Sequence, residues 1–188
     1  SSGVFPLFAQ KHPPLRKTTS QRILNGFLVL SCELVRAFAH MGCGVSKDES
    51  LRAHAAVNVN QAMPDGITPL YLAAQNGNEA VVRLLLAHAA VDPNQAEEDG
   101  MTPLYIAAQN GHEAVVRLLL AHAAVDPNQA DQEGRTPLYI AADEGNEAVV
   151  ELLLAHAAID ANQAEEGGMT PLNIAAQNSH EEVIEMLT

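Results

Sequence analysis

The chain has 188 residues, of which 23 are acidic and 10 are basic, so its formal net charge is −13. Apolar residues make up 47% of the chain, which is too high for a disordered protein, and the length favours one compact domain or one repeat array. The acidic balance excludes nucleic acid as the main partner, because a nucleic-acid backbone requires clustered Lys and Arg.

Aromatic residues make up only 4% of the chain, and there is no Trp. Alanine and leucine must then fill most of the core, which favours closely packed helices over a β-sandwich. Two cysteines cannot form a disulfide framework, and we therefore expect a cytoplasmic or otherwise intracellular protein, with a secreted effector as the alternative.

The N-terminal part of the chain differs in charge from the rest. Residues 1–57 contain seven basic and three acidic residues, a net charge of +4, whereas residues 58–188 contain three basic and 20 acidic residues, a net charge of −17. We expect residues 1–20 to form a basic, poorly structured segment.

An apolar run at residues 23–30 follows this segment. It is too short to span a bilayer as a helix, which requires about 20 residues, so we expect no membrane span. With Arg22 before it and Ser31 and Cys32 after it, the run is similar to a signal-peptide core followed by a lipoprotein cleavage box. Apolar residues continue at helical spacing as far as Phe38, and this pattern favours a packed helix instead.

The second part of the chain is an internal repeat. Residues 68–99 and 102–133 differ at only five of 32 positions. A unit of this length cannot bury its apolar face alone and must stack on its neighbours, as in a solenoid. The tripeptide Thr-Pro-Leu marks each unit every 34 residues, at Thr68, Thr102, Thr136 and Thr170.

Each repeat unit predicts two helices. Thr102 can cap a first helix in which Pro103 occupies the first position, and Gly111 can end that helix in a left-handed conformation. A second helix is predicted from about Glu113, with an apolar stripe facing the core. Asp126 and the proline after it then break the helix, and a tight turn leads into the next unit.

The segment 99–120, which begins Asp-Gly-Met-Thr-Pro-Leu, closely resembles the ankyrin repeat. The resemblance covers about residues 60–188 and implies an all-α solenoid of helix-turn-helix units with protruding turns. Upstream, residues 51–62 align with residues 85–96 at the same offset of 34, which indicates a degenerate repeat. We expect this repeat and the preceding helix to cap the apolar end of the stack.

These patterns divide the chain into six parts. They are a basic segment (1–20), an N-terminal helix with the degenerate capping repeat (21–62), three ankyrin repeats (63–96, 97–130 and 131–164) and a C-terminal partial or capping repeat (165–188).

The sequence departs from the ankyrin pattern at two kinds of position. The usual His after Thr-Pro-Leu is replaced by Tyr71, Tyr105, Tyr139 and Asn173, so the family's Thr–His hydrogen bond must be missing or replaced. Alanines 89, 123 and 157 stand where the family has a helix-ending glycine. A positive φ is costly for alanine, so we expect the second helix to continue for one or two residues.

No pattern of catalytic or metal-binding residues is present, and we expect neither an enzyme nor a cofactor. Equivalent histidines recur at 54, 88, 122 and 156. Stacked helices lie 8–10 Å apart, whereas zinc requires ligand nitrogens at about 2.0–2.1 Å, so adjacent repeats cannot share one ion through these rings. We expect the rings to donate instead to free carbonyls near the end of the second helix.

The resemblance implies a protein-binding module that is used through the turn tips and the concave side of the first helices. We expect a monomeric scaffold that binds another protein, and we hypothesise that this partner has a basic patch or segment; the alternative is that the acids only keep the alanine-rich solenoid soluble. The alternatives are a regulatory or inhibitory subunit that docks on an enzyme, an effector of an intracellular bacterium, and a spacer without a ligand. By motif, the candidate contact residues are Met63, Pro64, Asp65, Ile67, Gln75 and Asn76; Glu97, Glu98, Asp99, Met101, Gln109 and Asn110; Asp131, Gln132, Glu133, Arg135, Asp143 and Glu144; and Glu165, Glu166, Met169, Gln177 and Asn178.

Overall fold

The structure is a computed structural model that describes residues 58–188. The basic segment, the predicted N-terminal helix, most of the degenerate repeat, Cys32 and His54 lie outside the described residues. Within residues 58–188 there are eight helices and no strand, which confirms the predicted all-α solenoid. The helices are α3 (Pro69–Gln75), α4 (Glu79–Leu86), α5 (Pro103–Gln109), α6 (Glu113–Leu120), α7 (Pro137–Glu144), α8 (Glu147–Leu154), α9 (Pro171–Asn178) and α10 (Glu181–Leu187).

The first helix of each unit begins as the sequence predicts. The Thr102 hydroxyl accepts a hydrogen bond from the main-chain N–H of Tyr105 at 3.1 Å, and Pro103 occupies the first helical position. The same cap starts α3, α7 and α9. In α9 the side chain of Asn173 also accepts from the main-chain N–H of Thr170 at 3.1 Å, which completes a capping box and replaces the family's Thr–His bond.

The second helices start at the predicted place, and α6 begins at Glu113 after the left-handed Gly111 (φ +69°). Their predicted extension, however, is wrong, because α4, α6 and α8 end at Leu86, Leu120 and Leu154. The alanines that follow keep a negative φ. The chain instead makes tight turns, as in the bond from the main-chain N–H of His88 to the carbonyl of Leu85 at 3.0 Å.

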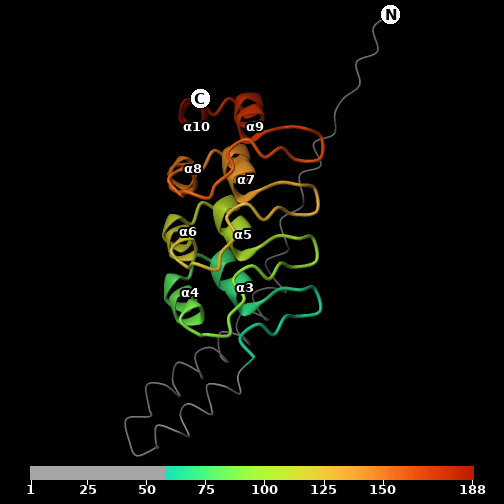
Figure 1. Cartoon of the computed structure of the whole chain (residues 1–188), viewed down its shortest axis with the longest axis vertical. Helices are drawn as coiled ribbons and strands as arrows, with labels where there is room; N and C mark the ends of the chain where they lie inside the picture. Colours follow the sequence, from blue (N-terminus) through green and yellow to red (C-terminus); the bar gives the residue numbers. More distant parts are fainter. Residues whose placement is uncertain (1–57) are drawn as a thin grey trace, which may run out of the picture. The chain divides into compact units, whose positions relative to one another are not determined.

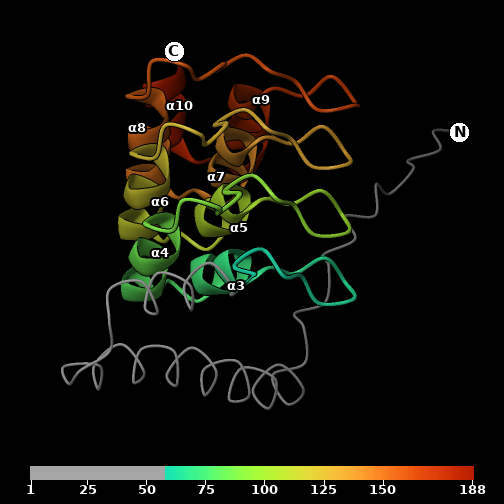
Figure 2. The same ribbon diagram turned by 60° about the horizontal axis from the view of Figure 1, so that its bottom comes forward.

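The helices form two layers. Figures 1 and 2 show α3, α5, α7 and α9 stacked in one layer and α4, α6, α8 and α10 stacked in the other. The core lies between the layers and contains fully buried Leu104, Val116 and Leu119. Ala107 and Ala108 are also fully buried, and their small side chains let neighbouring first helices approach closely. Alanine and leucine make up about half of the buried apolar residues between residues 58 and 188, and valine is as frequent as alanine, so the predicted alanine- and leucine-rich core is confirmed in part.

Side-chain amides join the loops that follow the second helices. Asn94 donates to the carbonyl of Ala124 at 2.6 Å and accepts from the main-chain N–H of Asp126 at 2.9 Å. Asn60 and Asn128 make the same two bonds to their own following loops. These bonds fix the rotation of each unit relative to the next and so set the register of the whole array.

A second set of side chains joins the units near the ends of the first helices. The Nε2 atom of His112 lies 3.0 Å from the carbonyl oxygen of Gln75, and Asn146 donates to the carbonyls of Ala108 and Gln109 at 2.9 Å each. Asn78 does cap α4, but His112 and Asn146 make no side-chain cap bond and connect units instead.

Candidate functional site

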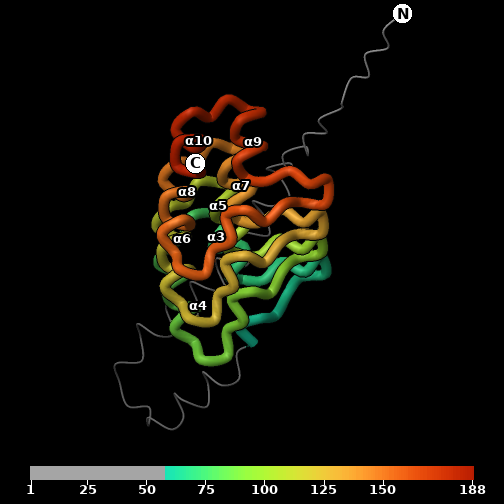
Figure 3. The backbone as a smooth tube through the Cα atoms, turned by 45° about the horizontal axis from the view of Figure 1, so that its top comes forward, coloured from blue at the N-terminus to red at the C-terminus, as the bar shows by residue number. Residues whose placement is uncertain are grey.

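The four hairpin turns between units are residues 63–67, 97–101, 131–135 and 165–169, and Figure 3 shows them stacked along one edge of the array. In the second turn the main-chain N–H of Glu97 donates to the carbonyl of Met101 at 3.1 Å, and that of Gly100 donates to the carbonyl of Glu97 at 3.0 Å. The other three turns repeat this pair of bonds. Gly100 has a φ of +86°, a conformation that favours glycine.

Successive turns are also bonded to each other through the main chain. The N–H groups of Glu98, Gln132 and Glu166 donate to a carbonyl of the preceding turn at 3.2, 3.0 and 2.9 Å. The contact is close, because a Cβ atom on Gly100 would lie 2.9 Å from the main-chain nitrogen of Gln132. The four turns therefore form one continuous hydrogen-bonded edge and not four independent loops.

The first residue of three turns is acidic, and its carboxylate folds back onto the turn. Glu97 accepts from the main-chain N–H groups of Asp99 and Met101 at 2.9 and 3.1 Å. Asp131 does the same for the N–H groups of Glu133 and Arg135 at 3.0 and 2.9 Å. Glu165 accepts from Met169 at 3.2 Å. These carboxylates therefore shape the turn by accepting bonds from its main chain.

Asp131 and Arg135 differ from their predicted role as exposed contact residues. Asp131 is only 8% exposed, and its carboxylate lies 2.7 Å from the guanidinium of Arg135. Glu133 lies 3.1 Å from the same guanidinium. Sequence reasoning identified the charges but not their pairing, and the only basic residue in the four turns is neutralised by its own turn.

The remaining turn acids face solvent. The exposed polar side chains at the tips of the turns are those of Asp65, Glu98, Asp99, Gln132, Glu133 and Glu166, and we call this set the tip surface. Behind the second turn, burial raises the pKa of Tyr71 far above its usual range, and the negative charges of Glu97, Asp99 and Asp65 raise it further. The tip surface is therefore strongly acidic.

The apolar residues expected on the rim are less accessible than predicted. Ile67, Met101 and Met169 are half-buried and pack against the core. Their outer atoms border the tip surface and can contribute only a small apolar contact.

The predicted residues at the ends of the first helices divide into two groups. Asn76 and Asn110 donate to the carbonyls of Leu72 and Ile106 at 2.7 and 2.9 Å and so cap their own helices. Asn178 donates to the carboxylate of Asp143 at 2.7 Å, which joins two units. The side chains exposed without an assigned bond are Glu144 and Gln177, and those of Gln75 and Gln109 are half-buried.

The recurring histidines form no shared site. Within residues 58–188, no group of three or more His, Cys, Asp or Glu side chains is arranged to hold a metal ion. The Nδ1 atoms of His88 and His156 accept from the main-chain N–H groups of Ala90 and Ala158 at 3.2 and 3.4 Å. At Nδ1 each of these two rings accepts a main-chain bond and helps to form the turn.

Among the helices of residues 58–188, none has the length and apolar character that crossing a bilayer requires.

Comparison with known proteins gives one family match. The family model described as ankyrin repeats in three copies matches residues 31–131 and 122–188. The first match begins inside the segment for which the sequence predicts a degenerate repeat. No curated protein matches the chain significantly.

Proposed function

The chain belongs to the ankyrin repeat family, whose repeats are generally protein–protein interaction modules, and from this premise we propose that it binds a partner protein through the tip surface and the adjoining ends of the first helices. We further propose that the partner presents a Lys- or Arg-rich patch or segment. On this proposal the chain is a non-enzymatic, intracellular scaffold.

The observation that carries the proposal is the combination of rigidity and unbalanced charge at the tips. Main-chain hydrogen bonds between successive turns hold the turn backbones in a fixed register. Binding a partner therefore costs little free energy for ordering these loops. Arg135, the one basic residue of the four turns, is already paired with Asp131 and Glu133, so within these turns no free cation offsets the exposed acids.

Electrostatic attraction would act mainly on the rate of association. Turns in direct hydrogen-bond contact place their acids well within one Debye length, which is about 10 Å at 0.1 M salt. Their fields then add and steer a basic partner, an effect that salt weakens.

The first experiment is affinity capture with the full chain as bait, followed by mass spectrometry and by binding of the purified partner. A basic protein that binds the wild-type chain supports the proposal. A captured enzyme whose activity falls on binding identifies an inhibitory subunit, and a host protein captured from eukaryotic cells identifies an effector. Absence of any stoichiometric partner indicates a spacer and contradicts the proposal.

The second experiment separates the tip surface from the rest of the acidic array. The double variant Glu98→Gln, Asp99→Asn removes two exposed acids and keeps Glu97, which holds the turn together. We expect its association rate to fall several-fold, and the wild-type rate to fall between about 50 mM and about 500 mM salt. Glu113→Gln combined with Glu147→Gln, on second helices, removes the same charge and should leave the rate nearly unchanged. Equal effects of the two double variants would contradict a binding site at the tips.

A further inference from the structure

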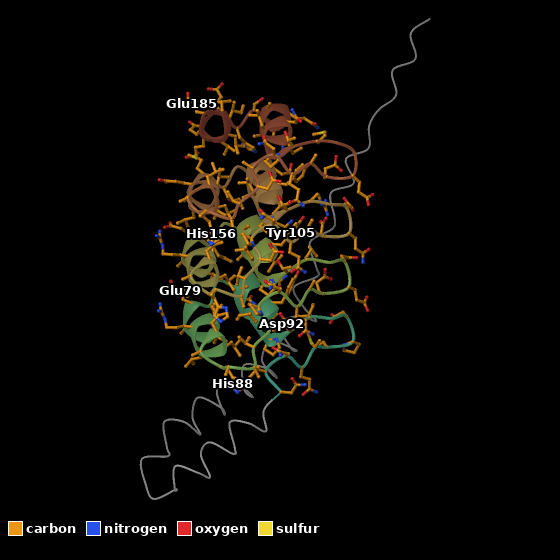
Figure 4. The ribbon with its side chains drawn as sticks, in the orientation of Figure 1. Glu79, His88, Asp92, Tyr105, His156 and Glu185 are labelled. Atoms are coloured by element: carbon orange, nitrogen blue, oxygen red, sulfur yellow. The ribbon has the colours of Figure 1, made fainter. Side chains whose placement is uncertain are left out.

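Two of the short connections between the helices of a unit contain an asparagine followed by a glycine. Asn76 and Gly77 join α3 to α4, and Asn110 and Gly111 join α5 to α6. Figure 4 shows Glu79, the first residue of α4, in the layer on the side away from the hairpin turns, so the first connection crosses from one layer to the other. In the described part of the chain, every other asparagine is followed by a residue that has a side chain.

An asparagine before a glycine is chemically labile, because glycine has no side chain to hinder its own main-chain nitrogen. That nitrogen attacks the side-chain carbonyl carbon of the asparagine and forms a cyclic succinimide, while the side-chain nitrogen leaves as ammonia with the proton of the glycine N–H. Water then opens the ring at either carbonyl. The product is aspartate, or isoaspartate, in which the main chain runs through the former side chain. Either product carries a new negative charge.

In the folded chain both reacting groups of the first connection are held by hydrogen bonds. The side-chain nitrogen of Asn76 donates to the carbonyl of Leu72 at 2.7 Å. The main-chain nitrogen of Gly77 donates to the carbonyl of Ala74 at 3.1 Å. The equivalent pair in the second connection makes the same two bonds, at 2.9 and 3.3 Å. The ring can close only after both bonds open, so the rate of conversion depends on local opening of this helix end.

The following unit closes over each of these connections. The His112 ring donates from Nε2 to the carbonyl of Gln75 at 3.0 Å, and a Cβ atom on Gly77 would lie 2.9 Å from the ring. Asn146 holds the second connection in the same way. It donates to two carbonyls at the end of α5 at 2.9 Å each, and a Cβ atom on Gly111 would lie 2.9 Å from its Oδ1 atom. The helix end therefore cannot open without loosening its contact with the next unit.

We propose that Asn76 and Asn110 are sites of slow, uncatalysed deamidation, and that contact with the following unit sets the rate at each site. Aspartate fits this position, because the third unit has Glu144 there, before the left-handed Gly145. Isoaspartate adds a main-chain atom beside a glycine that the next unit already contacts closely, so it loosens the junction between the units. Each conversion also adds a negative charge at the ends of the first helices, which adjoin the tip surface.

The test is incubation of the full-length chain at neutral pH, followed by peptide mapping with mass spectrometry, which measures conversion at each asparagine. The same chain in urea gives the rates without the fold. The native chain should convert at Asn76 and Asn110, more slowly than in urea but faster than at Asn178, which precedes Ser179 and is the internal control. A native chain in which neither site converts over several half-lives of the reaction in urea overturns the proposal.

The role of the following unit is tested by removing one of its contacts. Asn146→Ala should raise the native rate at Asn110 about fivefold, the change in local opening that the loss of one hydrogen bond produces, and should leave Asn76 unchanged. His112→Ala should do the same for Asn76, relative to the rate of that variant in urea. Asn146→His is the conservative control, because His112 shows that a histidine can make this contact, and it should keep the rate at Asn110 near the wild-type value.

Circular dichroism shows whether each variant is folded, and the two alanine variants test different junctions, so either one suffices should the other fail to fold. Rates that both alanine variants leave unchanged, or an Asn146→Ala variant that raises both sites equally, overturn the control of deamidation by the following unit. Partner binding at the tip surface does not depend on this result.

Discussion

The side-chain amide nitrogen of Asn94 donates a hydrogen bond to the main-chain carbonyl oxygen of Ala124, in the following loop, at a distance of 2.6 Å. The carbonyl of the same amide accepts from the N–H of Asp126 at 2.9 Å, so one side chain satisfies two main-chain groups of the next unit. The connection is made without any contact between apolar side chains, and it repeats at Asn60 and Asn128.

Replacing Asn94 with alanine should therefore lower the free energy of unfolding by about 1 kcal/mol, because two exposed main-chain groups of the next unit lose their partners and must bond water instead. Urea unfolding followed by circular dichroism measures the loss. Asn162→Ala is the control, since within the described residues the Asn162 side chain makes no bond to another unit. Equal losses in the two variants would show that the inter-unit bonds contribute little.

Gly100 and Gly168 offer a similar comparison at the hairpin turns. Both have a φ near +85°, at +86° and +85°, so alanine meets the same backbone strain at each, about 1–3 kcal/mol. A Cβ atom on Gly100 would also lie 2.9 Å from the nitrogen of Gln132, whereas one on Gly168 meets nothing within 4 Å. We expect Gly100→Ala to destabilise the chain more than Gly168→Ala, as measured by thermal unfolding. If Gly168→Ala destabilised the chain more than Gly100→Ala, the close contact between the second and third turns would contribute nothing to stability.

Leu119→Ala should cost about 2–5 kcal/mol, because Leu119 is fully buried and its removal leaves a cavity. In a solenoid the loss also weakens both neighbouring interfaces, so hydrogen exchange should accelerate in α4 and α8 as well as in α6. Leu84→Ala, at a position that is 58% exposed, should cost less than about 0.5 kcal/mol in dilute solution. If Leu119→Ala lowered the free energy of unfolding by less than about 0.5 kcal/mol, Leu119 would not be part of the core.

The helices could be predicted from the sequence because their signals are local. The Thr102 cap, the proline after it and the left-handed Gly111 act within a few residues, and the repeat shows the same signals four times. The loop after the second helix could not be predicted in the same way. Because alanines 89, 123 and 157 replace the helix-ending glycine of the family, we predicted a longer second helix. The chain instead reverses through two consecutive tight turns in which every residue keeps a negative φ, so no glycine is needed.

The candidate site could be predicted only in part, because its geometry depends on contacts between units. The sequence shows that Asp131 is acidic and lies in a turn. It does not show that the side chain turns inward to meet Arg135, since that depends on the conformation of the whole turn. The bonds of Asn94 link residues 30 and 32 positions apart, and only the recurrence of asparagine every 34 residues could have pointed to them.

Asp131→Ala should destabilise the third turn by about 2–3 kcal/mol, because two N–H groups and the half-buried Arg135 lose their acceptor. Asp131→Glu should recover most of this loss, since Glu97 and Glu165 accept from the same turn positions elsewhere. Urea unfolding of both variants tests the prediction. A Glu variant as unstable as the Ala variant would show that the ion pair requires the shorter side chain.

Glu97 provides a prediction about pH. Its pKa is raised above the usual range for glutamate, first by burial and then by the charges of Asp99 and Glu98, although two main-chain N–H groups act in the opposite direction. The folded state therefore binds the proton more readily than the unfolded state, so the ionised carboxylate costs stability at neutral pH, and this cost disappears as the pH falls through the raised pKa.

Glu97→Gln keeps an oxygen that can accept from Asp99 and Met101 but carries no charge. We expect the variant to be more stable than the wild type at neutral pH and equally stable well below the usual glutamate pKa, as measured by urea unfolding across the pH range. A variant that is less stable at neutral pH would show that the charge on Glu97 strengthens the turn bonds by more than its burial costs.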